Sequence, residues 1–115
     1  MNVLTLAGRV VSEPSRRDTT KGVVCEFRLA VECRPRLWIV VQTWGQTAGR
    51  AAQHLTAGRT IAASGMLISE SYITRSSETA VRWYLRASTI SFLDRPAGLA
   101  YRPAKIADRP AEAAR

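Results

Sequence analysis

Apolar and polar residues alternate along several stretches of the chain, which is the period of a half-buried β-strand. The clearest case is residues 23–33, where Phe27 and Leu29 share one face and Arg28 lies on the other. This is typical of an antiparallel strand with one face on the core and one face in water. The same period predicts four further strands, over residues 3–11, 37–44, 60–73 and 81–93.

One stretch, Thr47 to Leu55, has the helical period instead, because its alanines and Leu55 fall on one stripe. Thr47 is expected to cap the start of this helix, and Gly58 is expected to close its end in a left-handed conformation. Between the first two strands, Pro14 and the polar, basic run 15–22 predict a loop.

Two positions predict irregularities in the last two strands. Gly65 indicates a bend or bulge, and a loss of phase near Ser88 indicates a kink. The order is therefore three strands, one helix and two strands. This order predicts an all-β fold, a five-stranded barrel of the oligonucleotide-binding (OB) type with one short helix between strands 3 and 4. We expect this domain to span residues 1–94, followed by a flexible tail rich in Ala, Pro and Arg over residues 95–115.

The charge of the chain points to a polyanionic partner. Lys and Arg total 17 against 9 Asp and Glu, which gives a net charge of +8 over 115 residues. Basic residues release the counterions condensed on phosphates, although such a charge also serves solubility alone. The N-terminus has no apolar run behind a basic start, and no stretch is long enough to span a bilayer. We therefore expect a cytoplasmic, nucleoid-associated protein with no membrane partner.

Two tryptophans on the third predicted strand are the leading candidates for nucleic-acid contact. Trp38 and Trp44 are six positions apart, so they share a face of the strand. The opposite face supplies Leu37, Ile39 and Val41 to the core, which leaves both indoles outside the barrel. Bases stack on such rings at about 1–3 kcal/mol each, with little regard to their identity. The alternative is that the rings pack on the helix or at a subunit interface.

Three further aromatic residues lie on the last two predicted strands. Tyr72 is a candidate third stacking residue, or equally a surface tyrosine without a role. Trp83 shares its parity with Val81 and Leu85, which predicts that it belongs to the core. Tyr84 then has the opposite parity, and we interpret it as the more exposed of the two and as a candidate DNA contact.

Arginines are interleaved with these aromatic residues, which is the pattern expected of a groove that follows a nucleic-acid backbone. For any one arginine, a solvated surface charge is the alternative. Together the residues predict sequence-independent binding of single-stranded DNA, by base stacking and by arginine contacts to phosphates. The candidate arginines are Arg9, Arg28, Arg34, Arg36, Arg75, Arg82 and Arg86.

The sequence does not favour an enzyme. His54 is the only histidine, and the acidic residues are scattered, whereas a two-metal nuclease site needs clustered carboxylates. A phosphate-cradling glycine loop is also missing. Cys25 and Cys33 lack the paired spacing of a zinc site and are interpreted as small core residues. We therefore predict no catalytic residue, no metal and no cofactor.

Several motifs together carry a resemblance over residues 1–94. They are Met1-Asn2-Val3, Leu6-Ala7-Gly8-Arg9, Pro14, Arg17, Thr19, Gly22, Phe27-x-Leu29-Ala30, Trp38 through Val41, Trp44-Gly45, Ala48 through Leu55, Gly58, Gly65 and Phe92-Leu93-Asp94. In these the chain resembles the bacterial single-stranded DNA-binding protein family. The resemblance implies an OB fold, assembly as a homotetramer, and roles in replication, recombination and repair. It also implies that Trp38, Trp44 and Tyr72 occupy base-stacking positions.

The chain departs from the family pattern in three ways. The loops at residues 34–36 and around Ser76 are short, and Glu70 stands where the family tends to be basic. The residues 108–115 lack the acidic tip ending in Pro-Phe, so recruitment of partners through that tip is not expected. An alternative function is a primosome-type adaptor of the same fold, whose main role is protein interaction. Such adaptors tend to be dimers rather than tetramers.

Overall fold

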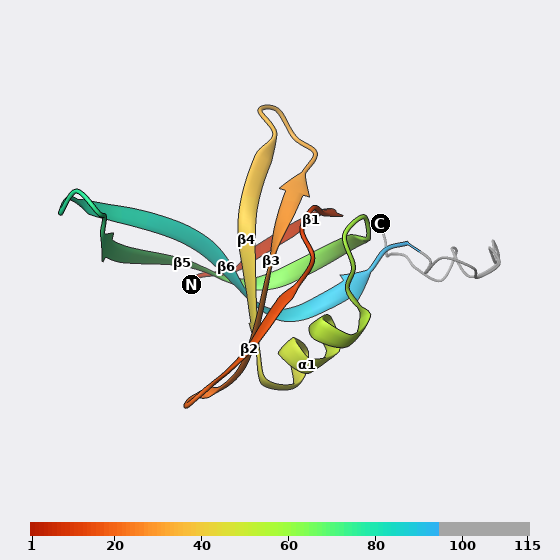
Figure 1. Ribbon diagram of the computed structural model, residues 1–115. Helices are drawn as coiled ribbons and strands as arrows, with labels where there is room; N and C mark the ends of the chain where they lie inside the picture. The colour runs from red at the N-terminus through yellow and green to blue at the C-terminus, as the bar shows by residue number, and fades with distance from the viewer. Residues whose placement is uncertain (95–115) are drawn as a thin grey trace, which may run out of the picture.

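The computed structural model describes residues 1–94, and the predicted tail at 95–115 lies outside this range. Six strands and one helix make up the described chain (Figure 1). They are β1 (Leu4–Val10), β2 (Ser15–Thr19), β3 (Gly22–Val31), β4 (Leu37–Trp44), α1 (Gly45–His54), β5 (Thr60–Ile73) and β6 (Thr79–Phe92).

The strands form one sheet in the order β1-β5-β6-β4-β3-β2, which closes on itself because β1 also pairs with β3. The closing pairs are Arg9 with Ala30 and Val10 with Leu29. All neighbours are antiparallel except β4 and β6, which run parallel. The result is a five-stranded barrel with β2 added at one edge and a helix between β4 and β5, so the predicted OB-type barrel is confirmed.

The strand β2 was not predicted, and the expectation of a loop over residues 15–22 is wrong for most of that run. Ser15 to Thr19 pair in register with Glu26 to Gly22 of β3. Most of its side chains are exposed, so this strand buries almost nothing and is held by its backbone pairing. Hydrophobic periodicity gives no signal for such a strand.

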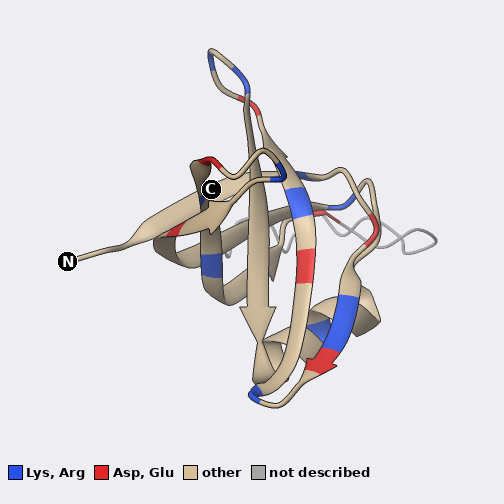
Figure 2. Ribbon diagram, turned by 60° about the vertical axis from the view of Figure 1, so that its left-hand side comes forward, with Lys and Arg blue, Asp and Glu red and all other residues tan. Residues whose placement is uncertain are grey.

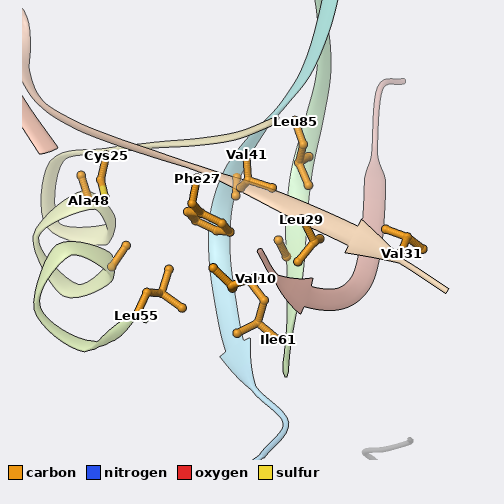
Figure 3. Close-up of a cluster of buried hydrophobic side chains, with 13 residues drawn as sticks. Val10, Cys25, Phe27, Leu29, Val31, Val41, Ala48, Leu55, Ile61 and Leu85 are labelled. Carbon is orange, nitrogen blue, oxygen red and sulfur yellow. The ribbon is translucent and has the colours of Figure 1, made fainter. Parts of the chain in front are cut away.

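The core lies inside the barrel and under the helix (Figure 3). The odd-numbered residues of β3 and β4 point inward, and α1 covers one end of the barrel with its small apolar face. Because each inward residue is followed by an outward one, the same alternation also fixes the outer surface. The fully buried side chains include Val10, Cys25, Leu29, Val41, Ile61 and Leu85.

The helix begins directly after β4 rather than at Thr47. Gly45 has a φ of 63°, a left-handed conformation that turns the chain from strand into helix without a connecting loop. Thr47 does not cap the helix, because its hydroxyl donates to the carbonyl oxygen of Ser88 at 3.3 Å. Gly58 has the left-handed φ expected of it, 99°, but it lies beyond Leu55, the C-cap residue of the helix. Its N–H donates to the carbonyl oxygen of Val10 instead.

The two cysteines have different environments. Cys25 is buried, and burial raises the pKa of its thiol above the ordinary 9.0, against the opposing effect of the Arg16 guanidinium. The prediction that Cys33 is also a core residue is wrong, because β3 ends at Val31 and Cys33 lies exposed beyond it.

The irregularity predicted at Gly65 is present. The register of β5 against β6 shifts between Ser64 and Gly65, which leaves Ser88 of β6 without a partner in the ladder. A side chain at Gly65 would collide with the backbone carbonyl of Arg86 on the facing strand. At the bulge, the backbones of β5 and β6 therefore lie closer together than a residue with a Cβ at position 65 would allow.

The replacement Gly65→Ala should lower the free energy of unfolding by about 1–3 kcal/mol, because the added methyl overpacks the contact with β6. Urea denaturation of the two proteins measures this difference. The matched control is Gly49→Ala, whose added methyl meets open space inside α1 and should raise stability by about 0.5–1 kcal/mol. Equal stability of the Gly65→Ala protein and the parent would contradict the account of the bulge.

Candidate nucleic-acid interface

The candidate interface is the surface made by the outward side chains of four neighbouring strands, which we call the outer face. These strands lie side by side in the order β3, β4, β6 and β5. The pairs Arg28 with Val40, Val40 with Tyr84, and Tyr84 with Ile68 cross these strands in register and place their side chains on one surface. The polar and aromatic members of the outer face are Glu26, Arg28, Trp38, Gln42, Trp44, Glu70, Tyr72, Arg82, Tyr84 and Arg86, and Arg17 adjoins them from β2.

Both tryptophans of β4 lie on the outer face and outside the core, as predicted. Trp38 is 49% exposed, and the guanidinium carbon of Arg28 lies 5.4 Å from the centre of its ring. Trp44 is half-buried at the end of the strand, and its indole N–H donates to the side-chain oxygen of Gln42 at 2.7 Å. The two rings are therefore held by different contacts: a cation lies over the face of the Trp38 ring, and a hydrogen bond holds the edge of the Trp44 ring.

The prediction for the next aromatic pair is wrong in both members. Trp83 is 59% exposed, whereas Tyr84 is only 2% exposed. Tyr84 does lie on the outer face, but Arg82 sits 4.9 Å from its ring and Arg86 donates to its hydroxyl at 3.4 Å. Its ring is thus covered in the free protein, which removes the argument that it is an exposed stacking residue.

Trp83 is exposed because it lies on the part of β6 that projects beyond the barrel. The parity that assigns Trp83 and Leu85 to one face is correct, but the β5–β6 hairpin extends well beyond the barrel (Figure 1). At that distance no core lies against the inward side, so both faces of the hairpin meet solvent. Val81, also on this side, is exposed as well.

The remaining predicted residues lie at the margins of the outer face. Tyr72 is 47% exposed and lies on the projecting part of β5, with Arg75 exposed in the hairpin turn beyond it. Arg34 and Arg36 are exposed in the β3–β4 connection, which forms a second projecting arm in Figure 1, and Arg36 forms an ion pair with Glu32 at 3.0 Å. Arg9 lies exposed on β1, paired with Ala30 next to the Trp38 position. The structure therefore spreads the predicted residues over a surface with two arms, and it does not gather them in a pocket.

Acidic side chains contact Arg82 on the outer face and Arg17 beside it. The carboxylate of Glu26 lies 3.4 Å from Arg17 and 3.9 Å from Arg82, and Glu70 lies 3.2 Å from Arg82. Figure 2 shows basic and acidic segments interleaved along neighbouring strands. Such partly exposed pairs contribute little to stability. They place acidic groups beside the guanidinium groups of Arg17 and Arg82, and they reduce the positive potential of the outer face.

Two residues of this surface were missed by the sequence reasoning. Arg17 was placed in a loop, so no face could be assigned to it. Gln42 shares the parity of Trp38 and Trp44, but nothing in the pattern shows that its side chain is 5% exposed and hydrogen-bonded through both its oxygen and its nitrogen. A glutamine between two tryptophans on one strand face was the available signal.

Within residues 1–94 no group of three or more His, Cys, Asp or Glu side chains could hold a metal ion. His54 instead lines a cavity of about 310 Å³ between α1 and β6, together with Thr47 and Ile90. In the same described range, no helix combines the length and the apolar character needed to cross a membrane.

A family model identifies the family of this chain, and two solved structures share its fold. A sequence model of the single-strand binding protein family matches residues 1–93. The fold is similar to that of a small single-stranded DNA-binding protein from Streptomyces coelicolor, with a TM-score of 0.67 and 22% identity, covering 80% of this chain and 95% of that one. It is also similar to the Plasmodium falciparum SSB in complex with ssDNA, with a TM-score of 0.72 and 22% identity, covering 82% and 96%. A search of curated proteins gave no match.

Proposed function

Since this chain belongs to the single-strand binding protein family, we propose that it binds single-stranded DNA without sequence preference. The family is one of DNA-binding proteins without enzymatic activity. Unpaired bases stack on Trp38 and Trp44, and arginines of the outer face contact phosphates. The observation that carries this mechanism is the placement of two indoles on the outer side of one strand, with the Arg28 guanidinium over the ring of Trp38.

The exposed ring of Trp38 supports stacking. A large apolar side chain in water is unfavourable until a partner covers it, and a base covers it whatever its identity. The six-residue spacing of Trp38 and Trp44 corresponds to about 20 Å along β4. A strand of DNA that reaches both rings therefore spans several nucleotides. That the Plasmodium protein of similar fold is in complex with ssDNA supports the choice of partner.

The cellular role we propose is to coat exposed single strands during replication, recombination or repair. Binding to the unpaired state alone shifts hairpins toward that state by mass action. We propose residues 1–94 as the binding domain, with Tyr72, Arg75 and the arginines at 34 and 36 extending it along the two arms. With this role, the protein would be associated with the nucleoid, where the DNA lies.

The double replacement Trp38→Ala and Trp44→Ala should weaken binding to oligo-dT by a few kcal/mol, because two stacking contacts of about 1–3 kcal/mol each are lost. Fluorescence anisotropy of labelled oligo-dT measures the affinity, and the affinity of the parent should fall as salt is added. The matched control is Trp83→Ala, which removes an exposed indole from the opposite side of the β5–β6 hairpin. Unchanged affinity in the double variant would remove the stacking mechanism.

The replacement Glu70→Gln should strengthen binding to oligo-dT about two- to fivefold. It removes a negative charge from the outer face and frees Arg82, now 3.2 Å from that carboxylate, for phosphate. The control Glu13→Gln removes the same charge at a site away from the outer face, where the carboxylate accepts the N–H of Ala57. If both variants gain equally, the effect is net charge alone and Glu70 has no local role.

We also propose that the protein is a homo-oligomer, with a tetramer as the expected form. The strand β1 pairs with β5 along Leu4 to Arg9, but with β3 only at Arg9 and Val10. Within residues 1–94, most of its second edge therefore has no partner strand, and such an edge pairs readily with another chain. Exposed apolar side chains beside this edge add surface for contact, among them Met1 and Val3.

Light scattering behind gel filtration, over a dilution series, should give the mass of four chains. A stable dimer that binds oligo-dT weakly would favour the second candidate, a primosome-type adaptor that bridges DNA and other proteins. A single chain at all concentrations would contradict both assemblies.

A further inference from the structure

We propose that Gln42 is a positioning residue that holds Trp44 ready for base stacking through a hydrogen-bonded relay. The indole N–H of Trp44 donates to the Gln42 oxygen at 2.7 Å, and the Gln42 nitrogen donates to Glu26 at 2.8 Å. The inference rests on the proposed function, because it concerns how one of the two stacking rings is held.

The chemistry of the three groups fixes the direction of the relay. An indole N–H can only donate, and a carboxylate can only accept, whereas a primary amide offers both an oxygen and a nitrogen. The amide of Gln42 therefore has one orientation that satisfies Trp44 and Glu26 together. In the flipped orientation the Gln42 nitrogen would face the indole N–H, and its oxygen would face the Glu26 carboxylate. Since Gln42 is only 5% exposed, water could not replace the two lost hydrogen bonds.

The far end of the relay is tied to other strands. Glu26 lies directly across from Gln42 in the β3–β4 register, and its carboxylate also contacts Arg17 of β2 and Arg82 of β6. These contacts restrict where the carboxylate can lie. The orientation of the Trp44 ring is therefore set by an arrangement of side chains from four strands.

The relay matters because Trp44 is otherwise weakly confined. It is half-buried and stands where β4 ends, directly before Gly45. A ring that must be ordered at the moment of binding costs conformational entropy, and a ring already held avoids this cost. Trp38 differs, because the only polar contact of its ring within residues 1–94 is the Arg28 guanidinium above it.

The replacement Gln42→Leu tests the relay, because it removes both hydrogen bonds at similar volume. In ¹⁵N-labelled protein, the Trp44 indole proton should be protected from exchange in the parent and should lose protection in the variant. Affinity for oligo-dT should fall about fivefold, which corresponds to one hydrogen bond of typical net strength. The control Gln53→Leu changes an exposed glutamine on α1 and should leave both measurements unchanged.

A swapped pair separates positioning from simple packing. Gln42→Glu alone keeps an acceptor for the indole but sets two carboxylates against each other, so it should weaken binding. Combined with Glu26→Gln, the donor and acceptor between the two positions are exchanged, and both indole protection and affinity should return. A residue that only fills space would show no such rescue. If Gln42→Leu does not fold, as judged by thermal melting, the swapped pair alone decides.

The outcomes distinguish the relay from the function on which it rests. A parent protein that does not bind oligo-dT would overturn the proposed function, while the exchange of the indole proton still reports on the hydrogen bond. A parent that binds, together with a folded Gln42→Leu variant of equal affinity, would overturn the relay. The same holds if the Trp44 indole proton exchanges freely in the parent.

Discussion

The closure of the sheet between β1 and β3 is the constraint on which the rest of the structure depends. Two residue pairs, Arg9 with Ala30 and Val10 with Leu29, convert an open sheet into a barrel with an inside and an outside. The two backbones approach so closely that a side chain at Gly8 would collide with the Ala30 carbonyl. Once the barrel is closed, the alternation of each strand assigns its side chains to the inner or the outer side of the sheet.

Much of this assignment was predictable from the sequence, because it depends only on period and parity. The strand predicted at 23–33, which the structure has at Gly22–Val31, the strand at 37–44 and the outward placement of Trp38 and Trp44 follow from alternation. The bulge follows from the glycine at position 65. What the sequence could not predict is where the inside ends. Parity is the same for Trp83 as for buried Leu85, but only the three-dimensional barrel shows that no core faces Trp83.

Two other misses have a related physical cause. β2 forms because β3 offers an unpaired backbone edge, and backbone pairing leaves no mark on the pattern of side chains. Tyr84 is outward by parity yet covered, because Arg82 and Arg86 fold their long side chains over its ring and hydroxyl. Such coverage depends on rotamers chosen among neighbours from several strands, which a single sequence does not reveal.

The direct passage from β4 into α1 has a mechanical consequence. No loop residues separate Trp44, the last residue of the strand, from Gly45, the first of the helix. Trp44 is also the N-cap residue of α1, so its backbone belongs to both elements. A movement of the helix against the barrel would shift the backbone that carries the indole, which couples the position of α1 to that of the Trp44 ring.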